Sequence, residues 1–155
     1  MTLGGLIMTE QGTFLRWFLR ALGTVSLLAV GAVVMPTSWM DAVHKALGMG
    51  PLPAEPIVGY LARSTSAFYA MFGGLLWVLS LDLRRYRPAL CYVGAATAVF
   101  GLALFGVDML EGMPPAWRLS EGPFVAALGI VILCGSYRIG PRGGGPSAPA
   151  GGESP

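Results

Sequence analysis

Charged side chains are scarce in this sequence: Asp, Glu, Lys and Arg make up only 12% of its 155 residues, whereas 54% are hydrophobic. Soluble domains carry roughly 25% charged residues. A soluble fold with so few charges could not cover its own surface, so we expect lipid to form part of the solvent. The net charge of +2 is too small, and the basic residues are too widely spread, to favour nucleic acid as a partner.

Side chains that commonly bind metals or form disulfides are also few. The two cysteines, Cys91 and Cys134, each lie in an apolar run, and neither a CxxC pair nor the Cys/His spacing of a metal site occurs. We therefore expect two buried free thiols and no bound metal or cofactor. His44 is the only histidine. We interpret it as an interfacial packing residue in preference to a haem ligand, for which a methionine could be the second axial ligand.

Catalytic motifs are missing as well. The sequence has no GxSxG, HExxH or P-loop pattern and no paired carboxylate with a nearby histidine. Asp108 and Glu111 are three residues apart, which could place both on one face of a helix end, but nothing beside them supports general acid–base chemistry. We therefore interpret the protein as non-enzymatic.

Long uncharged runs are what the sequence does have, and they predict an all-α fold with a four-transmembrane-helix bundle. A helix that crosses the hydrocarbon core needs about 20 apolar residues. The four predicted spans are at about residues 17–36, 57–81, 89–108 and 121–137, and together they form a transmembrane domain over 14–138. The first span reaches full length if Arg16 and Arg20 snorkel to the interface. A cleaved signal peptide is the alternative, but no clear A-x-A site is present.

Three segments outside these spans have their own patterns. Residues 1–13 are predicted to be a flexible N-terminus, and the Gly/Pro/Ser/Ala-rich tail over 139–155 is predicted to be disordered. Between the first two spans, Met40, Val43 and Leu47 recur with helical spacing, and His44 falls on the same face. This pattern predicts a short amphipathic helix over 39–47 that lies on the outer membrane face.

The basic residues predict the orientation of the spans. An N-terminus on the inside places seven arginines on the cytoplasmic side and leaves Lys45, Arg63 and Arg118 outside, in agreement with the positive-inside rule. The strongest signal is the loop from Asp82 to Pro88, with three arginines. We therefore expect a multi-pass protein of the inner (plasma) membrane with both termini in the cytoplasm.

Small residues form a stripe on each of two predicted spans. Membrane helices associate through close backbone approach, which small side chains permit. One stripe lies on the second span and one on the third: Ala62, Ser66, Ala70 and Gly74, then Gly94, Thr97, Ala98 and Gly101. We predict that these two stripes pack against each other in an antiparallel hairpin, although they could equally serve a homo-oligomer.

Opposite charges lie at the outer ends of these two spans. Measured from Arg85 in the loop between them, Arg63 and Asp108 reach about the same depth. Each charge is unfavourable for the dipole of its own helix, so each would compensate the other. We predict an Arg63–Asp108 ion pair, with Glu121 and Glu111 nearby. A structural clamp or a snorkelling arginine is the first interpretation of this cluster, and a ligand or ion site is the second.

Several short motifs resemble a bacterial family. The stretch from Leu61 to Ala70, the pair Gly73-Gly74 and the loop Asp82-Leu-Arg-Arg-Tyr-Arg-Pro88 are similar to those of the uncharacterised DUF4345-type membrane proteins. Gly106-Val-Asp108 and Glu121-Gly-Pro-Phe124 fit the same pattern. The resemblance covers residues 14–137 and implies a four-helix membrane fold, without an activity or site residues to transfer.

The sequence thus favours a non-enzymatic accessory, assembly or interaction component. Its expected partners are the lipid bilayer and either a second copy or another membrane protein. The alternative is a module that binds or transports a lipid, ion or small molecule at the outer polar cluster. A membrane enzyme is the third class, which the missing motifs disfavour.

Overall fold

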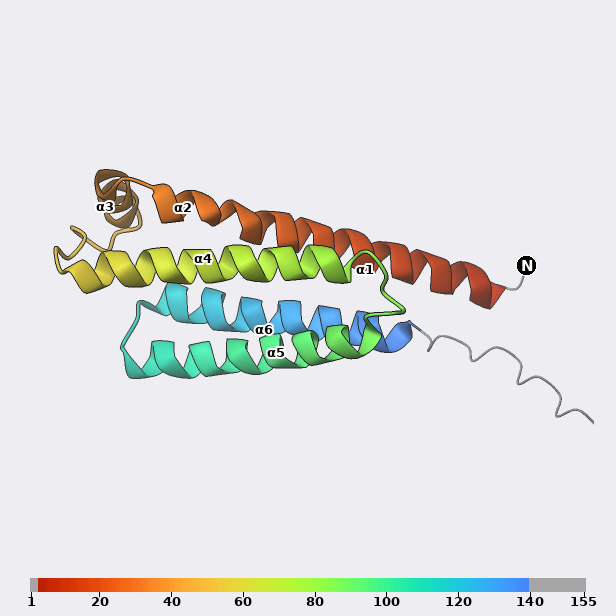
Figure 1. The fold of residues 1–155 in the computed structure, drawn as a ribbon. Coiled ribbons are helices and arrows are strands. Elements are labelled where there is room, and N and C mark those ends of the chain that lie inside the picture. Colours follow the sequence, from red (N-terminus) through yellow and green to blue (C-terminus); the bar gives the residue numbers. More distant parts are fainter. Residues whose placement is uncertain (1–2, 140–155) are drawn as a thin grey trace, which may run out of the picture. The chain divides into compact units, whose positions relative to one another are not determined.

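The computed structural model describes residues 3–139, with side chains from Gly12 onward, and all regular structure in this part is helical (Figure 1). The elements are α1 (Leu3–Leu28), α2 (Val30–Val34), α3 (Thr37–Ala46), α4 (Pro56–Leu79), α5 (Arg87–Leu110) and α6 (Pro115–Arg138). The predicted all-α class is confirmed for these residues. The predicted disordered tail lies outside them from residue 140 onward.

Proline and glycine set most of the helix boundaries. Pro56 and Pro115 are the first residues of α4 and α6, where the missing N–H leaves no hydrogen bond unmade. Gly48 and Gly50 follow α3 with φ of 78° and 81°, and Gly112 turns the chain after α5 with φ of 66°. Residues other than glycine rarely adopt these left-handed conformations, so the helices end there.

The helices differ from the predicted segments mainly at their N-termini. The amphipathic helix expected over 39–47 is present as α3. However, α1 begins at Leu3, so most of the segment 1–13, which was predicted to be flexible, is helical. α6 begins at Pro115, before the predicted residue 121. The predicted spans began at or just after charged residues, whereas both helices continue through them: Glu10 and Arg16 lie within α1, and Arg118 and Glu121 lie within α6.

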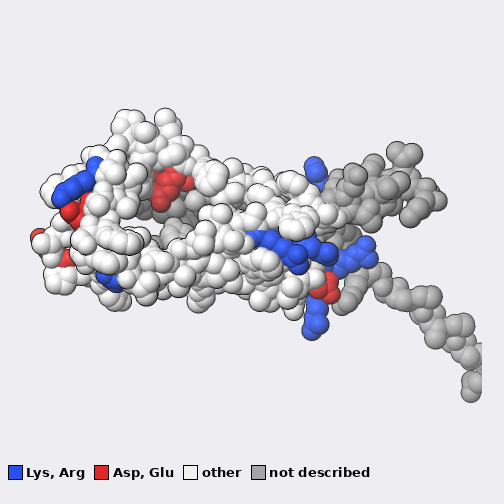
Figure 2. Space-filling view, turned by 90° about the horizontal axis from the view of Figure 1, so that it is seen from above, with Lys and Arg blue, Asp and Glu red and all other residues white. Residues whose placement is uncertain are grey.

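Three stretches are long and apolar enough to cross a membrane: Gly12–Val34 with 23 residues, and Arg87–Leu110 and Pro115–Arg138 with 24 each. α4 is equally long but is not among them. Its first half carries the polar run Arg63-Ser-Thr-Ser66, which lowers its mean hydropathy. The structure therefore has three clear candidate spans and a fourth long helix of mixed character. On the face shown in Figure 2, most of the surface is uncharged and the charges gather towards the ends.

The chain divides into two compact units, one formed by Gly12–Asp82 and the other containing Leu83–Ile139. In the first unit, α1 and α4 run antiparallel and approach each other closely at Gly23 and Gly73 (Figure 1). A Cβ built on Gly73 would lie 2.5 Å from the carbonyl oxygen of Gly23. Gly74, which was predicted to pack against the third span, has nothing within 4 Å of a Cβ position, and the Gly73 contact is with α1 instead.

The second unit contains the antiparallel hairpin of α5 and α6. Gly94, Ala98 and Gly101 of α5 lie against Gly129, Ala126 and Gly122 of α6, so close that a Cβ on Gly129 would be 2.2 Å from the Ala98 nitrogen. The predicted stripe on the third span is thus a contact face, but α6 covers it where the second span was expected. The prediction paired neighbours across the cytoplasmic loop and missed the matching small residues on the fourth span.

The same spacing recurs on both helices of this hairpin. Small or interface residues follow each other at intervals of four, three, four and three residues: Gly94, Ala98, Gly101, Phe105 and Asp108 on α5, and Gly122, Ala126, Gly129, Leu133 and Ser136 on α6. This average of 3.5 residues is the repeat that keeps one seam of a helix facing its partner along a left-handed, nearly antiparallel crossing. Asp108 and Ser136 therefore lie on the two ends of the seam, and both are buried.

Candidate functional site

The residues of the predicted outer cluster belong to different units. Arg63 and His44 lie in the unit Gly12–Asp82, whereas Asp108, Glu111 and Glu121 lie in the other. The Arg63–Asp108 ion pair therefore stays a prediction.

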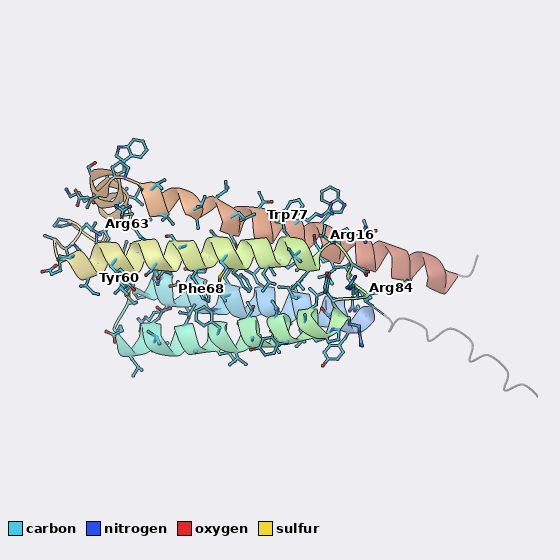
Figure 3. The ribbon with its side chains drawn as sticks, in the orientation of Figure 1. Arg16, Tyr60, Arg63, Phe68, Trp77 and Arg84 are labelled. Atoms are coloured by element: carbon cyan, nitrogen blue, oxygen red, sulfur yellow. The ribbon has the colours of Figure 1, made fainter. Side chains whose placement is uncertain are left out.

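Arg63 is half-buried and donates a hydrogen bond from Nη1 to the backbone carbonyl oxygen of Val33 (Figure 3). Val33 lies in the last turn of α2, where carbonyl groups have no partner in the helix itself. Pro36 follows and has no N–H to offer. Arg63 thus caps α2 from the neighbouring helix. In this unit the hydrogen-bond partner of Arg63 is a backbone carbonyl group, which is compatible with a structural role for this residue.

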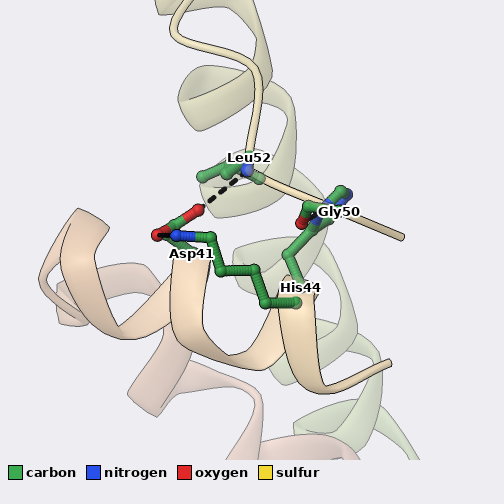
Figure 4. A network of polar contacts seen from close by, with 5 residues as sticks. Asp41, His44, Gly50 and Leu52 are labelled. Carbon is green, nitrogen blue, oxygen red and sulfur yellow. Dashed lines mark hydrogen bonds and ion pairs between the residues drawn. The ribbon is translucent and has the colours of Figure 1, made fainter. Parts of the chain in front are cut away.

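A polar network ties α3 to the loop that follows it (Figure 4). Asp41 accepts a 2.6 Å ion-paired hydrogen bond from Lys45 and a 2.8 Å bond from the backbone N–H of Leu52. His44 Nδ1 lies 2.8 Å from the carbonyl oxygen of Gly50. The contacts of Asp41 with Leu52 and of His44 with Gly50 hold residues 48–55 back against the helix. His44 therefore holds the loop to α3 through its ring nitrogen, a contact that the predicted role in interfacial packing did not include.

The bond from Lys45, followed by the one from the Leu52 N–H, holds the pKa of Asp41 below its ordinary value. Hydrogen bonds and a positive neighbour both stabilise the carboxylate form. Asp41 is consequently ionised at neutral pH, and its charge is matched by Lys45.

A pocket of about 640 Å³ opens between this fastened loop, the start of α3 and the first turns of α4. Its polar lining comes from α3, from α4 and from the end of the loop between them: Thr37, Ser38, Asp41, Lys45, Glu55, Tyr60 and Arg63. The rest of the wall consists of Pro51, Leu52, Pro53 and Ala54 of the loop and Pro56 and Gly59 of α4. Sequence reasoning found Arg63 but missed the pocket, because the return of the loop depends on contacts that no local pattern encodes.

Asp108 is 6% exposed, and its Oδ2 atom has no hydrogen-bond partner in the described part of the chain. It lies on the α5 seam one turn beyond Phe105, which packs on Gly122. Close by in sequence, Arg118 of α6 donates from Nη1 to the thioether of Met109 at 3.4 Å. A buried carboxylate oxygen without a partner is costly in any apolar setting, so Asp108 remains the most unusual polar group of this unit.

The other predicted acidic residues have local roles. Glu121 accepts a hydrogen bond from Nε1 of Trp117, one turn earlier on α6. Glu111 is exposed and follows the last turn of α5. These contacts do not bring Glu111 and Asp108 together as an acid–base pair.

Both units also use arginine at the end predicted to be cytoplasmic. Arg20 donates from Nε to Ser80 Oγ at 3.3 Å, and its guanidinium lies 5.8 Å and 5.2 Å from the ring centroids of Trp17 and Trp77. In the other unit, Arg87 donates from Nε to the carbonyl oxygen of Ser136 at 3.1 Å. The Arg20 cluster was missed by sequence reasoning. Its signal was an aromatic–polar pair three residues apart on each helix.

Metal binding finds no support in the described residues, since no group of three or more His, Cys, Asp or Glu side chains comes together there. Both cysteines are free thiols, as expected. The expectation that both are buried is wrong, because Cys91 is half-buried and Cys134 is exposed. Cys134 lies beside the α6 seam residue Leu133, on a face that α5 does not cover.

No protein-family model, curated protein or solved structure matches this chain.

Proposed function

We propose that this chain is a multi-pass protein of the inner (plasma) membrane that crosses the bilayer four times, with both termini in the cytoplasm. The fourth span would be α4, which has the length of α5 and α6 and packs along the apolar α1. Its one charge, Arg63, lies close to the end predicted to be outside and is bonded to Val33. An arginine so placed can reach the headgroup region, which lowers the cost of its insertion.

We further propose that the protein works as a non-enzymatic interaction component, whose partner is another membrane helix. One observation carries this proposal: the face of α4 that contains Ala67, Ala70 and Gly74 has no close neighbour at Gly74. Ala67 is exposed, and Ala70 and Gly74 are only half-buried. On a membrane helix, a surface of small side chains makes few contacts with lipid. It does allow the backbone of a second helix to approach closely.

The contrast with Gly73 supports this interpretation. Gly73 is already in contact with α1 through Gly23 and Leu27, so its small size is explained within the unit. Gly74 is one residue further round the helix and has no such explanation. The resemblance to the DUF4345-type family is compatible with this proposal and adds no activity to it.

Site-specific photo-crosslinking in intact cells tests the proposal. A photoreactive residue at Ala67, on the same face as Gly74, is expected to give a discrete protein adduct, either with a second copy or with another membrane protein. The same residue at Gly106 is the control, since that position also has nothing within 4 Å but lies on α5. Gly74→Leu should abolish the adduct by blocking the approach. Equal yields at Ala67 and Gly106, or an adduct insensitive to Gly74→Leu, would reject the interaction face.

A further inference from the structure

The pocket between α3 and α4 combines two kinds of charge in one cavity. Lys45 and Asp41 neutralise each other at 2.6 Å. Arg63 and Glu55 line the same pocket without being paired with each other by any bond found among the described side chains. The cavity therefore offers one cationic and one anionic group on a background of net zero charge. Such a lining suits a zwitterion better than a simple anion or cation, either of which would meet one opposing charge.

Arg63 is suited to hold the negative end of such a ligand. A guanidinium has five N–H donors, and the bond to Val33 uses one of them. Its planar arrangement of donors matches the oxygens of a phosphate. Thr37, Ser38 and Tyr60 line the same cavity, and each has a hydroxyl group that can donate to the remaining phosphate oxygens.

Glu55 is suited to hold the positive end. It directly precedes α4 with extended backbone angles, φ of −64° and ψ of 132°, and it is one of the residues that line the pocket. A carboxylate binds a primary ammonium through charge-assisted hydrogen bonds. A quaternary ammonium has no N–H to donate, so the pocket discriminates between the two.

The position of the cavity identifies the source of the ligand. It is lined by the residues that follow the apolar stretch Gly12–Val34 and by the first turns of α4. In the membrane orientation proposed above, on which this inference rests, that is the depth of the lipid headgroups. Tyr60, which is 66% exposed, is of the residue type enriched at this depth.

We propose that this pocket binds the headgroup of a phosphatidylethanolamine-type lipid, with Arg63 and the three hydroxyl residues on the phosphate and Glu55 on the primary ammonium. The loop bonds from Asp41 to Leu52 and from His44 to Gly50 hold the cavity open in advance of binding. Such preorganisation reduces the ordering cost of the complex.

Native mass spectrometry of the full-length protein in mild detergent tests the proposal. The probes are short-chain phosphatidylethanolamine, phosphatidylcholine and phosphatidylglycerol, each titrated separately, and soluble phosphoethanolamine as a competitor. The expected result is about tenfold tighter binding of the ethanolamine lipid than of the choline lipid, the factor for one charge-assisted hydrogen bond. Equal binding of all three lipids, or none, would overturn the proposal. Phosphoethanolamine as tight as the lipid would overturn the lipid source.

Two variants assign the roles within the pocket. Glu55→Gln should remove the preference for ethanolamine over choline, whereas the matched exposed carboxylate variant Glu111→Gln should retain it. Arg63→Lys keeps a donor for Val33 and should weaken the binding of both zwitterionic lipids. A preference that survives Glu55→Gln contradicts the assigned role of that residue. Crosslinking at Ala67 reports independently on the helix partner, so the two proposals fail separately.

Discussion

Alanine at Gly129 should destabilise the α5–α6 hairpin far more than its size suggests. A Cβ at this position would lie 2.2 Å from the nitrogen of Ala98, 2.7 Å from its Cα and 2.7 Å from the carbonyl oxygen of Gly94. Ordinary van der Waals contact begins at 3.4 Å. All three neighbours are backbone atoms, so the clash cannot be relieved by the movement of a flexible side chain. The helices must therefore separate locally by 3.4 − 2.2 = 1.2 Å.

Separation by this amount has an energetic cost along the whole seam. Overpacking a well-packed interior by a methyl group typically costs about 1–3 kcal/mol, and rigid backbone neighbours favour the upper half of that range. The adjacent contacts at Gly94, Gly101 and Gly122 lose dispersion energy at the same time, because a gap of 0.5–1 Å already forfeits a quarter to a half of each contact. We expect Gly129→Ala to reduce the free energy of unfolding by about 2–3 kcal/mol.

The assay is reversible unfolding of the purified protein by SDS in mixed micelles, followed by circular dichroism. Gly106→Ala is the matched control, because Gly106 lies on α5 with nothing within 4 Å of its Cβ position. Alanine there should be neutral or stabilise the helix by up to about 1 kcal/mol. If Gly129→Ala and Gly106→Ala unfold at the same SDS fraction, the close approach of α5 and α6 is not a feature of the protein in solution.

Three further outcomes are expected. Because the pKa of Asp41 is lowered on folding, its contribution to loop stability is fully present above the ordinary value of 3.8 and is lost as the pH falls through the lower folded pKa. Fluorescence of Trp39 on α3 should report this acid transition, and Asp41→Asn should remove it. Trp77→Phe loses the 3.1 Å bond to Thr24 and weakens the contact with Arg20, so the SDS unfolding assay should show a loss of about 1 kcal/mol. Asp41→Asn should leave SDS unfolding of the α5–α6 hairpin unchanged, since the two lie in different units; a shift there would contradict their independence.

The helical class and the positions of the apolar runs followed from the sequence because composition and run length depend on local residues alone. The spacing of apolar residues likewise predicted α3 to within two residues, and the second uncharged run predicted the start of α4 to within one. The beginnings of α1 and α6 did not follow, since both helices extend N-terminally past the charged residues at which the uncharged runs end. Composition does not mark α4 as a span in the way that it marks the other three stretches, because one arginine and three hydroxyl residues lower its mean hydropathy.

Tertiary partners were harder to predict. The stripe on α5 was recognised from its spacing, but the equivalent residues Gly122, Ala126 and Gly129 on α6 were not, so the wrong partner was chosen. The cap that Arg63 provides to Val33 depends on a backbone group, which carries no sequence signature. The pocket depends on the return of residues 48–55 through Asp41 and His44, a geometry that periodicity does not encode. The Arg63–Asp108 pair remains a prediction, which charge reversal of each residue singly and of both together would test.

Labelling of single cysteines from the two sides of the membrane tests the four-span topology most directly. In a background of Cys91→Ser and Cys134→Ser, Met49→Cys marks the loop before α4 and Arg85→Cys the loop after it. A membrane-impermeant maleimide added to intact spheroplasts should label residue 49 and leave residue 85 unlabelled, with the reverse in inverted vesicles. Labelling of both positions from the same side would show that α4 does not cross the membrane and would contradict the proposed topology.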